Sequence, residues 1–131
     1  MRVYLDTVSV IYLVENVTPF EATVRNRLSD PEIDQVCSDL SRLECRVKPI
    51  RDNDVELLAE YDRYFETIIV EIVSLSRPVL DRATALRARY GFKTPDAIHL
   101  AAAIVGDCDV FLTNDHRLDR CTEIKVEQIS N

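Results

Sequence analysis

The stretch that decides the fold is residues 93–106, which read KTPDAIHLAAAIVG. Its pattern predicts a helix with both ends marked. Thr94 is a residue type that caps the first free backbone N–H groups, and Pro95 suits the first helical turn, where its missing N–H is not needed. Gly106 is expected to be the left-handed residue just past the end. Because the positions between them are apolar on almost every side, we expect this helix to lie inside the protein.

One charged residue stands in this apolar helix. Asp96 lies in the first turn, where the helix dipole favours a carboxylate, so it could serve only as part of the cap. A carboxylate is also costly to bury without a partner, so the same position predicts a positive charge nearby. The stretch by itself leaves both interpretations open.

Apolar runs on either side of the helix predict strands. Residues 2–5 form a short apolar run that ends at Asp6, and residues 110–112 form another that is followed by Thr113, Asn114 and Asp115. Other patterns predict helices over residues 7–14, 19–28, 38–47, 54–66 and 78–90, and strands over residues 33–37, 68–73 and 123–129. Strands that alternate with helices predict an α/β fold, with a mainly parallel sheet covered on both faces.

Composition limits the class of protein. At 131 residues, the length fits one domain spanning 1–131, and a hydrophobic fraction of 47% is ordinary for a globular core. The net charge of −7 argues against a broad basic surface for nucleic acid, and it favours a basic partner. It does not exclude a nucleic-acid enzyme whose positive charges are local or supplied by a metal.

The apolar runs and the cysteines of the sequence indicate the cellular compartment. No apolar run approaches the roughly 20 residues that span a bilayer, and the first residues lack a signal-peptide pattern. The four cysteines form no CxxC pair, so buried free thiols are expected; they are Cys37, Cys45, Cys108 and Cys121. We therefore expect a cytoplasmic protein without a membrane segment.

A fourth acidic residue of interest lies in the predicted helix over residues 38–47. Leu40, Leu43 and Val47 share one stripe of that helix, and Glu44 falls on the same stripe. The spacing predicts that the Glu44 carboxylate faces the core rather than solvent. A structural ion pair is the alternative explanation.

These four acids could share one place. Asp6 and Asp115 end strands, Asp96 begins a helix, and Glu44 faces the core, so in a parallel sheet all four could meet at the carboxyl edge. Four neighbouring carboxylates need a cation or must take up protons. Oxygen ligands without histidine or thiol suit Mg²⁺ or Mn²⁺ better than zinc.

Four segments in order carry a resemblance to a known family. They are VYLDT at 3–7, LSRLEC at 40–45, TPDAIHLA at 94–101 and FLTND at 111–115. Together they resemble the PIN domain, and the length and order resemble a VapC-type toxin ribonuclease over essentially the whole chain. The resemblance implies a three-layer α/β/α sandwich. It identifies the family's catalytic and metal-binding acids with Asp6, Glu44, Asp96 and Asp115.

The resemblance also implies an activity and partners. The expected reaction is metal-dependent hydrolysis of RNA phosphodiester bonds, with Mg²⁺ or Mn²⁺, to 5′-phosphate and 3′-hydroxyl ends. The expected role is the toxin of a type II toxin–antitoxin system. The expected partners are RNA, a VapB-type antitoxin and a second copy of the chain in a homodimer.

Secondary positions are expected around these acids. The family usually has a small polar residue directly after Asp-Thr, but Val8 stands there, and Ser9 could replace it. Thr7 belongs to the same segment. Thr113 and Asn114 fit the family and could orient Asp115 or a water molecule.

Three further residues have two explanations each. Lys93 and Arg117 flank the expected site and could hold a substrate phosphate, or they could be solvated surface. His99 lies one turn after Asp96 and could be a general base or a hydrogen-bonded structural histidine.

Two other classes compete with the nuclease. A PIN-like module that binds a partner without catalysis would have the same fold, but the presence of all four acids argues against it. A phospho-accepting receiver domain has similar length and architecture. It would need an acid pair near the first strand and a late lysine, which Asp6 alone and the Thr113-Asn114-Asp115 segment do not supply.

Overall fold

The computed structural model describes residues 1–129, and within them five strands form one sheet. All pairings are parallel, in the order β3-β2-β1-β4-β5, so the predicted α/β fold with a mainly parallel sheet is confirmed. In chain order the elements are β1 (Arg2–Leu5), α1 (Thr7–Val14), α2 (Phe20–Arg27), β2 (Asp34–Ser38), α3 (Asp39–Arg51), α4 (Val55–Thr67), β3 (Glu71–Val73), α5 (Arg77–Tyr90), α6 (Thr94–Val105), β4 (Val110–Thr113), the short 3-10 helix η1 (His116–Arg120) and β5 (Lys125–Gln128).

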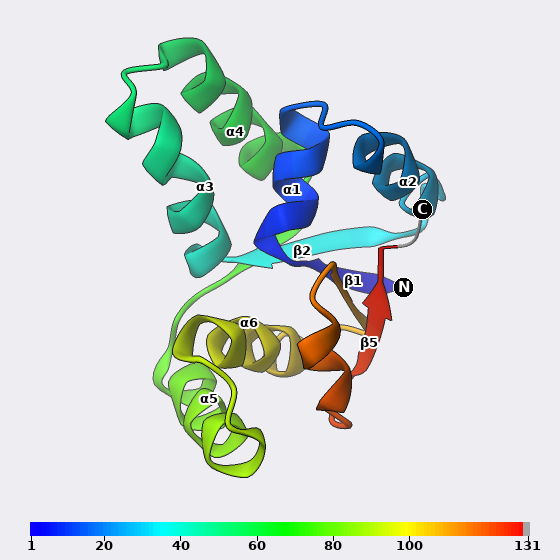
Figure 1. Cartoon of the computed structure of the whole chain (residues 1–131), viewed down its shortest axis with the longest axis vertical. Coiled ribbons are helices and arrows are strands. Elements are labelled where there is room, and N and C mark those ends of the chain that lie inside the picture. Colours follow the sequence, from blue (N-terminus) through cyan, green and yellow to red (C-terminus); the bar gives the residue numbers. More distant parts are fainter. Residues whose placement is uncertain (130–131) are drawn as a thin grey trace.

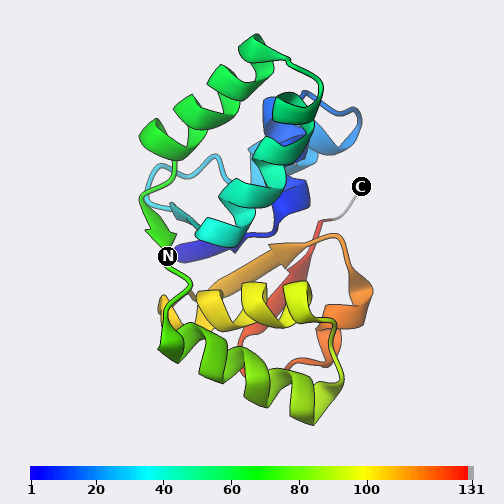
Figure 2. The same cartoon turned by 90° about the vertical axis from the view of Figure 1, so that its left-hand side faces the viewer.

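Helices cover both faces of the sheet. Helices α1 to α4 lie on one side and α5 with α6 on the other, as Figures 1 and 2 show. Side chains alternate along β1 between the two faces: Val3 and Leu5 pack in the core beneath α1, whereas Tyr4 packs in the core beneath α6. Each face therefore has its own hydrophobic core, which gives the predicted three-layer arrangement.

Helix α6 is buried as predicted, but its ends differ from the expectation. The helix begins at Thr94, so Lys93 takes the capping position and makes no side-chain cap. Gly106 is not left-handed, since its φ is −78°. A glycine is needed there for space: a Cβ atom would lie 2.9 Å from the Ala102 carbonyl oxygen and 2.9 Å from Val73 Cγ2. The helix predicted over residues 78–90 ends at Gly91, which is left-handed with φ 75°.

The predicted apolar stripe on α3 is wrong. Leu43 and Val47 are 57% and 51% exposed, and the buried residues of this helix are Ser41, Cys45 and Pro49. The helix also continues through Pro49, and together with α4 it projects from the sheet as a hairpin (Figures 1 and 2). Only a narrow side of α3 therefore meets the rest of the protein.

Other boundaries shift for local reasons. Helix α2 begins at Phe20, one residue after its predicted start at 19, and it has no side-chain cap. Helix α4 runs to Thr67, which delays β3 to Glu71. All four cysteines are free, and only Cys108 is partly exposed rather than buried.

The domain is predicted to span residues 1–131, and its last two positions, 130 and 131, lie outside the described residues. Within residues 1–129, the helices are too short or too polar for any of them to cross a membrane.

Candidate active site

Asp6 and Asp115 are brought together by the pairing of β1 with β4. The backbone N–H of Asp6 donates to the Leu112 carbonyl oxygen at 3.0 Å. Thr113, which is fully buried, donates from Oγ1 to Asp6 Oδ2 at 2.7 Å and accepts from the Asp115 N–H at 3.1 Å. The other oxygen of Asp6, Oδ1, accepts from the Thr7 N–H at the start of α1. One threonine hydroxyl therefore links the two strand-end acids.

Asp96 lies within the electrostatic field of both. It is partly buried in the first turn of α6. Burial raises the pKa of Asp96, and the negative charges of Asp115 and Asp6 raise it further. Arg117 and His99 oppose this but do not outweigh it. The structure thus places three of the four predicted acids at one edge of the sheet, where their charges repel.

Glu44 reaches the site from α3 with different surroundings. Its Oε1 accepts from Thr7 Oγ1 at 2.6 Å and lies 2.6 Å from His99 Nε2. Burial alone would raise the pKa of Glu44, but the hydrogen bonds from His99 and Thr7 hold it below its usual range. Although the apolar stripe was mistaken, Glu44 does point inward.

His99 is hydrogen-bonded on both ring nitrogens. The side chain is 4% exposed, and Nδ1 lies 2.7 Å from the hydroxyl of Tyr4, which also contacts Ser38 Oγ at 2.9 Å and Ser41 Oγ at 3.2 Å. Sequence reasoning missed Tyr4 and Ser41. A tyrosine in a buried strand needs a partner for its hydroxyl, and that signal could have pointed to this cluster.

The side chains of two expected supporting residues form no hydrogen bond to the acids within the described residues. Asn114 donates from Nδ2 to the hydroxyl of Tyr12 at 2.9 Å. Ser9 is fully buried, and its Oγ has no hydrogen-bond partner among residues 1–129. The structure therefore gives Ser9 no visible role as the replacement for a polar residue at position 8.

The two flanking cations differ from each other. Arg117 forms a two-pronged ion pair with Asp115, with Nε 3.0 Å from Oδ1 and Nη2 2.6 Å from Oδ2. These hydrogen bonds hold the pKa of Asp115 below its usual range. Lys93 is exposed at the start of α6 and forms no ion pair within the described part of the chain. Lys93 is therefore the free positive charge nearest to Asp96 along the chain.

This arrangement agrees with the match between the sequence and the PIN domain family over residues 3–124. The chain belongs to the PIN-domain family. A comparison with curated proteins finds no match.

Solved structures share the fold of this PIN domain. A chain of VapBC2 from Rickettsia felis, bound to a DNA fragment from their promoter, is 15% identical with a TM-score of 0.79, covering 99% of this chain and 100% of that chain. DNA-bound VapBC from Salmonella typhimurium is 15% identical with a TM-score of 0.76, covering 99% of each chain. Mycobacterium tuberculosis VapC20, a toxin that cleaves the sarcin–ricin loop, is 12% identical with a TM-score of 0.68, covering 83% and 86%. At these identities the likeness concerns the fold.

The acids of this PIN domain suit a hard divalent cation in charge and in ligand type. Asp6, Asp96 and Asp115 offer only carboxylate oxygens, and their mutual repulsion favours a positive charge between them. Within residues 1–129, no three acidic, histidine or cysteine side chains are close enough to enclose an ion by themselves. Mg²⁺ keeps several waters and binds through one or two carboxylates plus substrate phosphates, so an open arrangement fits it.

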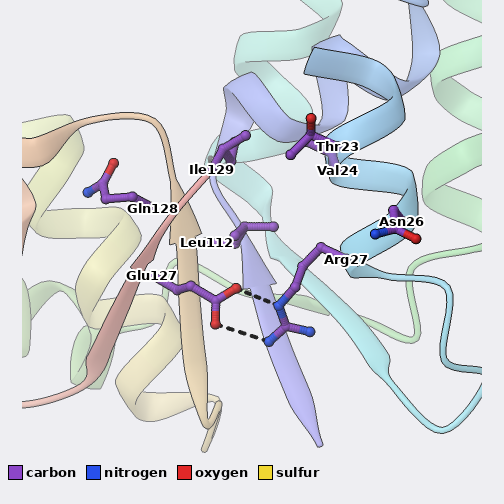
Figure 3. A pocket seen from close by; sticks show the side chains of 8 residues that line it. All are labelled: Thr23, Val24, Asn26, Arg27, Leu112, Glu127, Gln128 and Ile129. Atoms are coloured by element: carbon purple, nitrogen blue, oxygen red, sulfur yellow. Dashed lines mark hydrogen bonds and ion pairs between the residues drawn. The ribbon is translucent and has the colours of Figure 1, made fainter. Parts of the chain in front are cut away.

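A separate hollow of about 320 Å³ lies between α2 and β5 (Figure 3). Val24, Leu112 and Ile129 give it apolar walls, and Arg27 forms an ion pair with Glu127 across it. The positive charge of Arg27 is therefore already neutralised, and none of the four acids lines this hollow. We assign no part of the chemistry to it.

Proposed function

We propose that this PIN domain is a divalent-metal-dependent endoribonuclease that acts in the cytoplasm as the toxin of a VapBC-like toxin–antitoxin pair. The observation that carries the proposal is the junction made by Thr113, which holds Asp6 and Asp115 together beside Asp96. Repelling carboxylates are costly to keep at one place, and a site that uses a cation gives a reason for them.

The chemistry follows from the kind of cation that fits. When bound, Mg²⁺ or Mn²⁺ would lower the pKa of a water molecule and stabilise charge on a phosphate that is being displaced. Asp6, Asp96 and Asp115 would hold it, with Glu44 beside them. Hydrolysis adds water across the P–O3′ bond, which leaves a 5′-phosphate and a 3′-hydroxyl.

The chain's own groups prepare this site. Thr113 fixes the carboxylate of Asp6, while Thr7 and His99 fix that of Glu44. Lys93, exposed beside the first turn of α6, would attract the phosphates of an RNA strand. The similarity in fold to VapC20, which cleaves the sarcin–ricin loop, supports RNA as the substrate.

The main experiment measures cleavage and metal binding together. Purified protein is incubated with RNA and Mg²⁺ or Mn²⁺, and Mn²⁺ binding is followed by calorimetry. Asp6→Asn and Asp96→Asn should each reduce cleavage by about 10³-fold, the scale of losing a group that stabilises charge in the transition state. Asp81→Asn, which removes an exposed acid on α5, should cleave RNA like the wild type.

Two outcomes would contradict the proposal. One is the absence of RNA cleavage by the wild type with either metal. The other is Mn²⁺ binding that does not change in Asp6→Asn or Asp96→Asn, which is the behaviour expected of a module that only binds a partner.

The antitoxin and the homodimer are parts of the same proposal. The net charge of −7 and the acids at the sheet edge suit a basic segment of an antitoxin lying against the site. Removing the cationic residues of that segment should relieve inhibition, and unchanged inhibition would contradict this arrangement. Analytical ultracentrifugation of the purified chain should show a dimer, and a monomer at all concentrations would contradict the second part.

A further inference from the structure

A buried line of hydrogen bonds lies behind Glu44. It begins at Ser38 and Ser41, passes through the hydroxyl of Tyr4 and the ring of His99, and ends on Glu44 Oε1. Four of these five residues are between 0% and 3% exposed as whole residues, so water does not compete with the contacts. The line joins β1, α3 and α6, which are far apart in the sequence.

The contact with Glu44 determines which ring nitrogen of His99 carries a proton. An ionised carboxylate can only accept, so the contact of 2.6 Å between His99 and Glu44 requires a proton on His99 Nε2. Thr7 Oγ1 donates to the same oxygen. Both hydrogen bonds that reach Glu44 within the described residues therefore end on Oε1, and Oε2 is left for a ligand.

The hydroxyl of Tyr4 has little to do with packing. The Tyr4 ring stacks on Phe111 at 5.2 Å between centroids, and phenylalanine could make that contact equally well. The hydroxyl instead touches His99 Nδ1 and the two serines that cap α3, Ser38 and Ser41. One polar atom thus sets both the angle of the imidazole and the start of the helix that carries Glu44.

We propose that Tyr4 and His99 are positioning residues that present Oε2 of Glu44 to the bound cation of the active site. This inference rests on the proposed function for the identity of the ligand. The prearranged hydrogen bonds fix one carboxylate oxygen and orient the other. Outer partners of this kind commonly change metal affinity or activity by about 10–100-fold when removed.

Three variants test this role. Tyr4→Phe keeps the ring and removes only the hydroxyl. His99→Gln keeps an N–H donor at the position of Nε2, whereas His99→Leu has a similar size and no donor. Each variant is compared with the wild type by thermal unfolding, so that loss of fold is recognised. Mn²⁺ affinity is measured by calorimetry, and RNA cleavage is separated into kcat and KM.

The expected results separate positioning from simple packing. Tyr4→Phe and His99→Leu should bind Mn²⁺ about 10-fold more weakly and lose a similar factor in kcat. The KM for RNA should be unchanged, because both residues are buried. His99→Gln should recover most of both losses. If His99→Gln and His99→Leu are equally impaired while both remain folded, the hydrogen bond to Glu44 is not what matters and the proposal is wrong.

A spectroscopic readout tests the inference on the protein alone. Nitrogen NMR of the His99 side chain should show Nε2 protonated in the wild type. In Tyr4→Phe the exchange of the Nε2 proton should become faster, because the ring has lost its anchor. An unprotonated Nε2 in the wild type would overturn the proposal. This spectrum does not depend on catalysis, so a protein with the predicted spectrum but no RNA cleavage would refute the nuclease and not the hydrogen-bonded arrangement of Glu44.

Discussion

Glu44 and Asp96 are both partly buried carboxylates of the predicted site, and they come from helices on opposite faces of the sheet, α3 and α6. Their surroundings differ. Two hydrogen-bond donors, Thr7 and His99, meet Glu44 and hold its pKa below the usual range. Burial and the charges of Asp115 and Asp6 instead raise the pKa of Asp96. The protein itself stabilises the charge of Glu44 on one helix and only partly compensates the charge of Asp96 on the other.

The difference shows how the work is divided within the site. One carboxylate oxygen of Glu44 is held by hydrogen bonds at the end of the line from Tyr4. Its other oxygen is available to a ligand. Asp96 is the carboxylate that would gain most from a cation. If this comparison is right, substitutions on the two sides should change stability in opposite directions.

Among the tests of this comparison, the largest effect should come from the junction at Thr113, which keeps Asp6 beside Asp115. Thr113→Val has nearly the same shape but removes the hydrogen bond to Asp6 and the acceptor for the Asp115 N–H. We expect Mn²⁺ affinity, measured by calorimetry, to fall by about 10–100-fold. Thr113→Ser keeps the hydroxyl and should stay close to the wild type. Equal losses in the two variants would indicate a packing effect instead.

The next effect concerns stability at neutral pH, with opposite signs. Asp96→Asn removes the repelled charge, so its melting temperature should rise by a few degrees. Glu44→Gln weakens two charge-assisted hydrogen bonds and should lower the free energy of unfolding by about 1 kcal/mol. Denaturant unfolding and calorimetry measure both. A decrease of stability in both variants would break the comparison.

The same two variants should respond to acid in a defined way. The pKa of Glu44 is lowered in the folded state, so its contribution to stability is present above the unfolded value of about 4.3 and is lost as pH falls through the folded pKa. The pKa of Asp96 is raised, so its charge begins to destabilise the fold above about pH 4. Unfolding at pH 7 and pH 3 should therefore show both differences from the wild type shrinking at pH 3. A stability gain in Asp96→Asn that persists at pH 3 would exclude charge repulsion as its cause.

The smallest effect should come from the free cation beside Asp96. Lys93→Gln should weaken RNA binding by a few-fold and reduce the slope of log affinity against log salt by about 0.7, the value for one contact to a single strand. Binding is measured on an Asp6→Asn background, so that RNA is not cleaved. Arg63→Gln makes the same charge change on the exposed side of α4 and serves as the control. An unchanged salt slope in Lys93→Gln would remove Lys93 from the proposed path of RNA.

The strand-end residues could be predicted from sequence because their signal is local. An apolar run followed by an acid places that acid at the carboxyl edge of a parallel sheet, and Asp6 and Asp115 both lie there. Asp96 was predictable because proline and apolar residues mark the beginning of a buried helix. These rules need only neighbouring residues.

The features that failed depend on contacts across the chain. The face of α3 that is buried was mispredicted because the helix pairs with α4 and projects from the sheet, which leaves Leu43 and Val47 exposed. The role of Tyr4 depends on Ser38, Ser41 and His99, which are separated from it in sequence by 34, 37 and 95 positions. Sequence periodicity carries no information about such distant partners.

The close packing around Gly106 has a mechanical consequence for Asp96. The two residues stand at opposite ends of α6, and the foot of the helix touches Val73 so tightly that no Cβ fits. An α-helix is stiff along its axis, so a larger residue at position 106 would shift α6 along that axis by a few tenths of an ångström. Asp96, about 15 Å from position 106, would move with the helix. A larger residue at position 106 would therefore change the distance between the repelling carboxylates through a contact at the opposite end of α6.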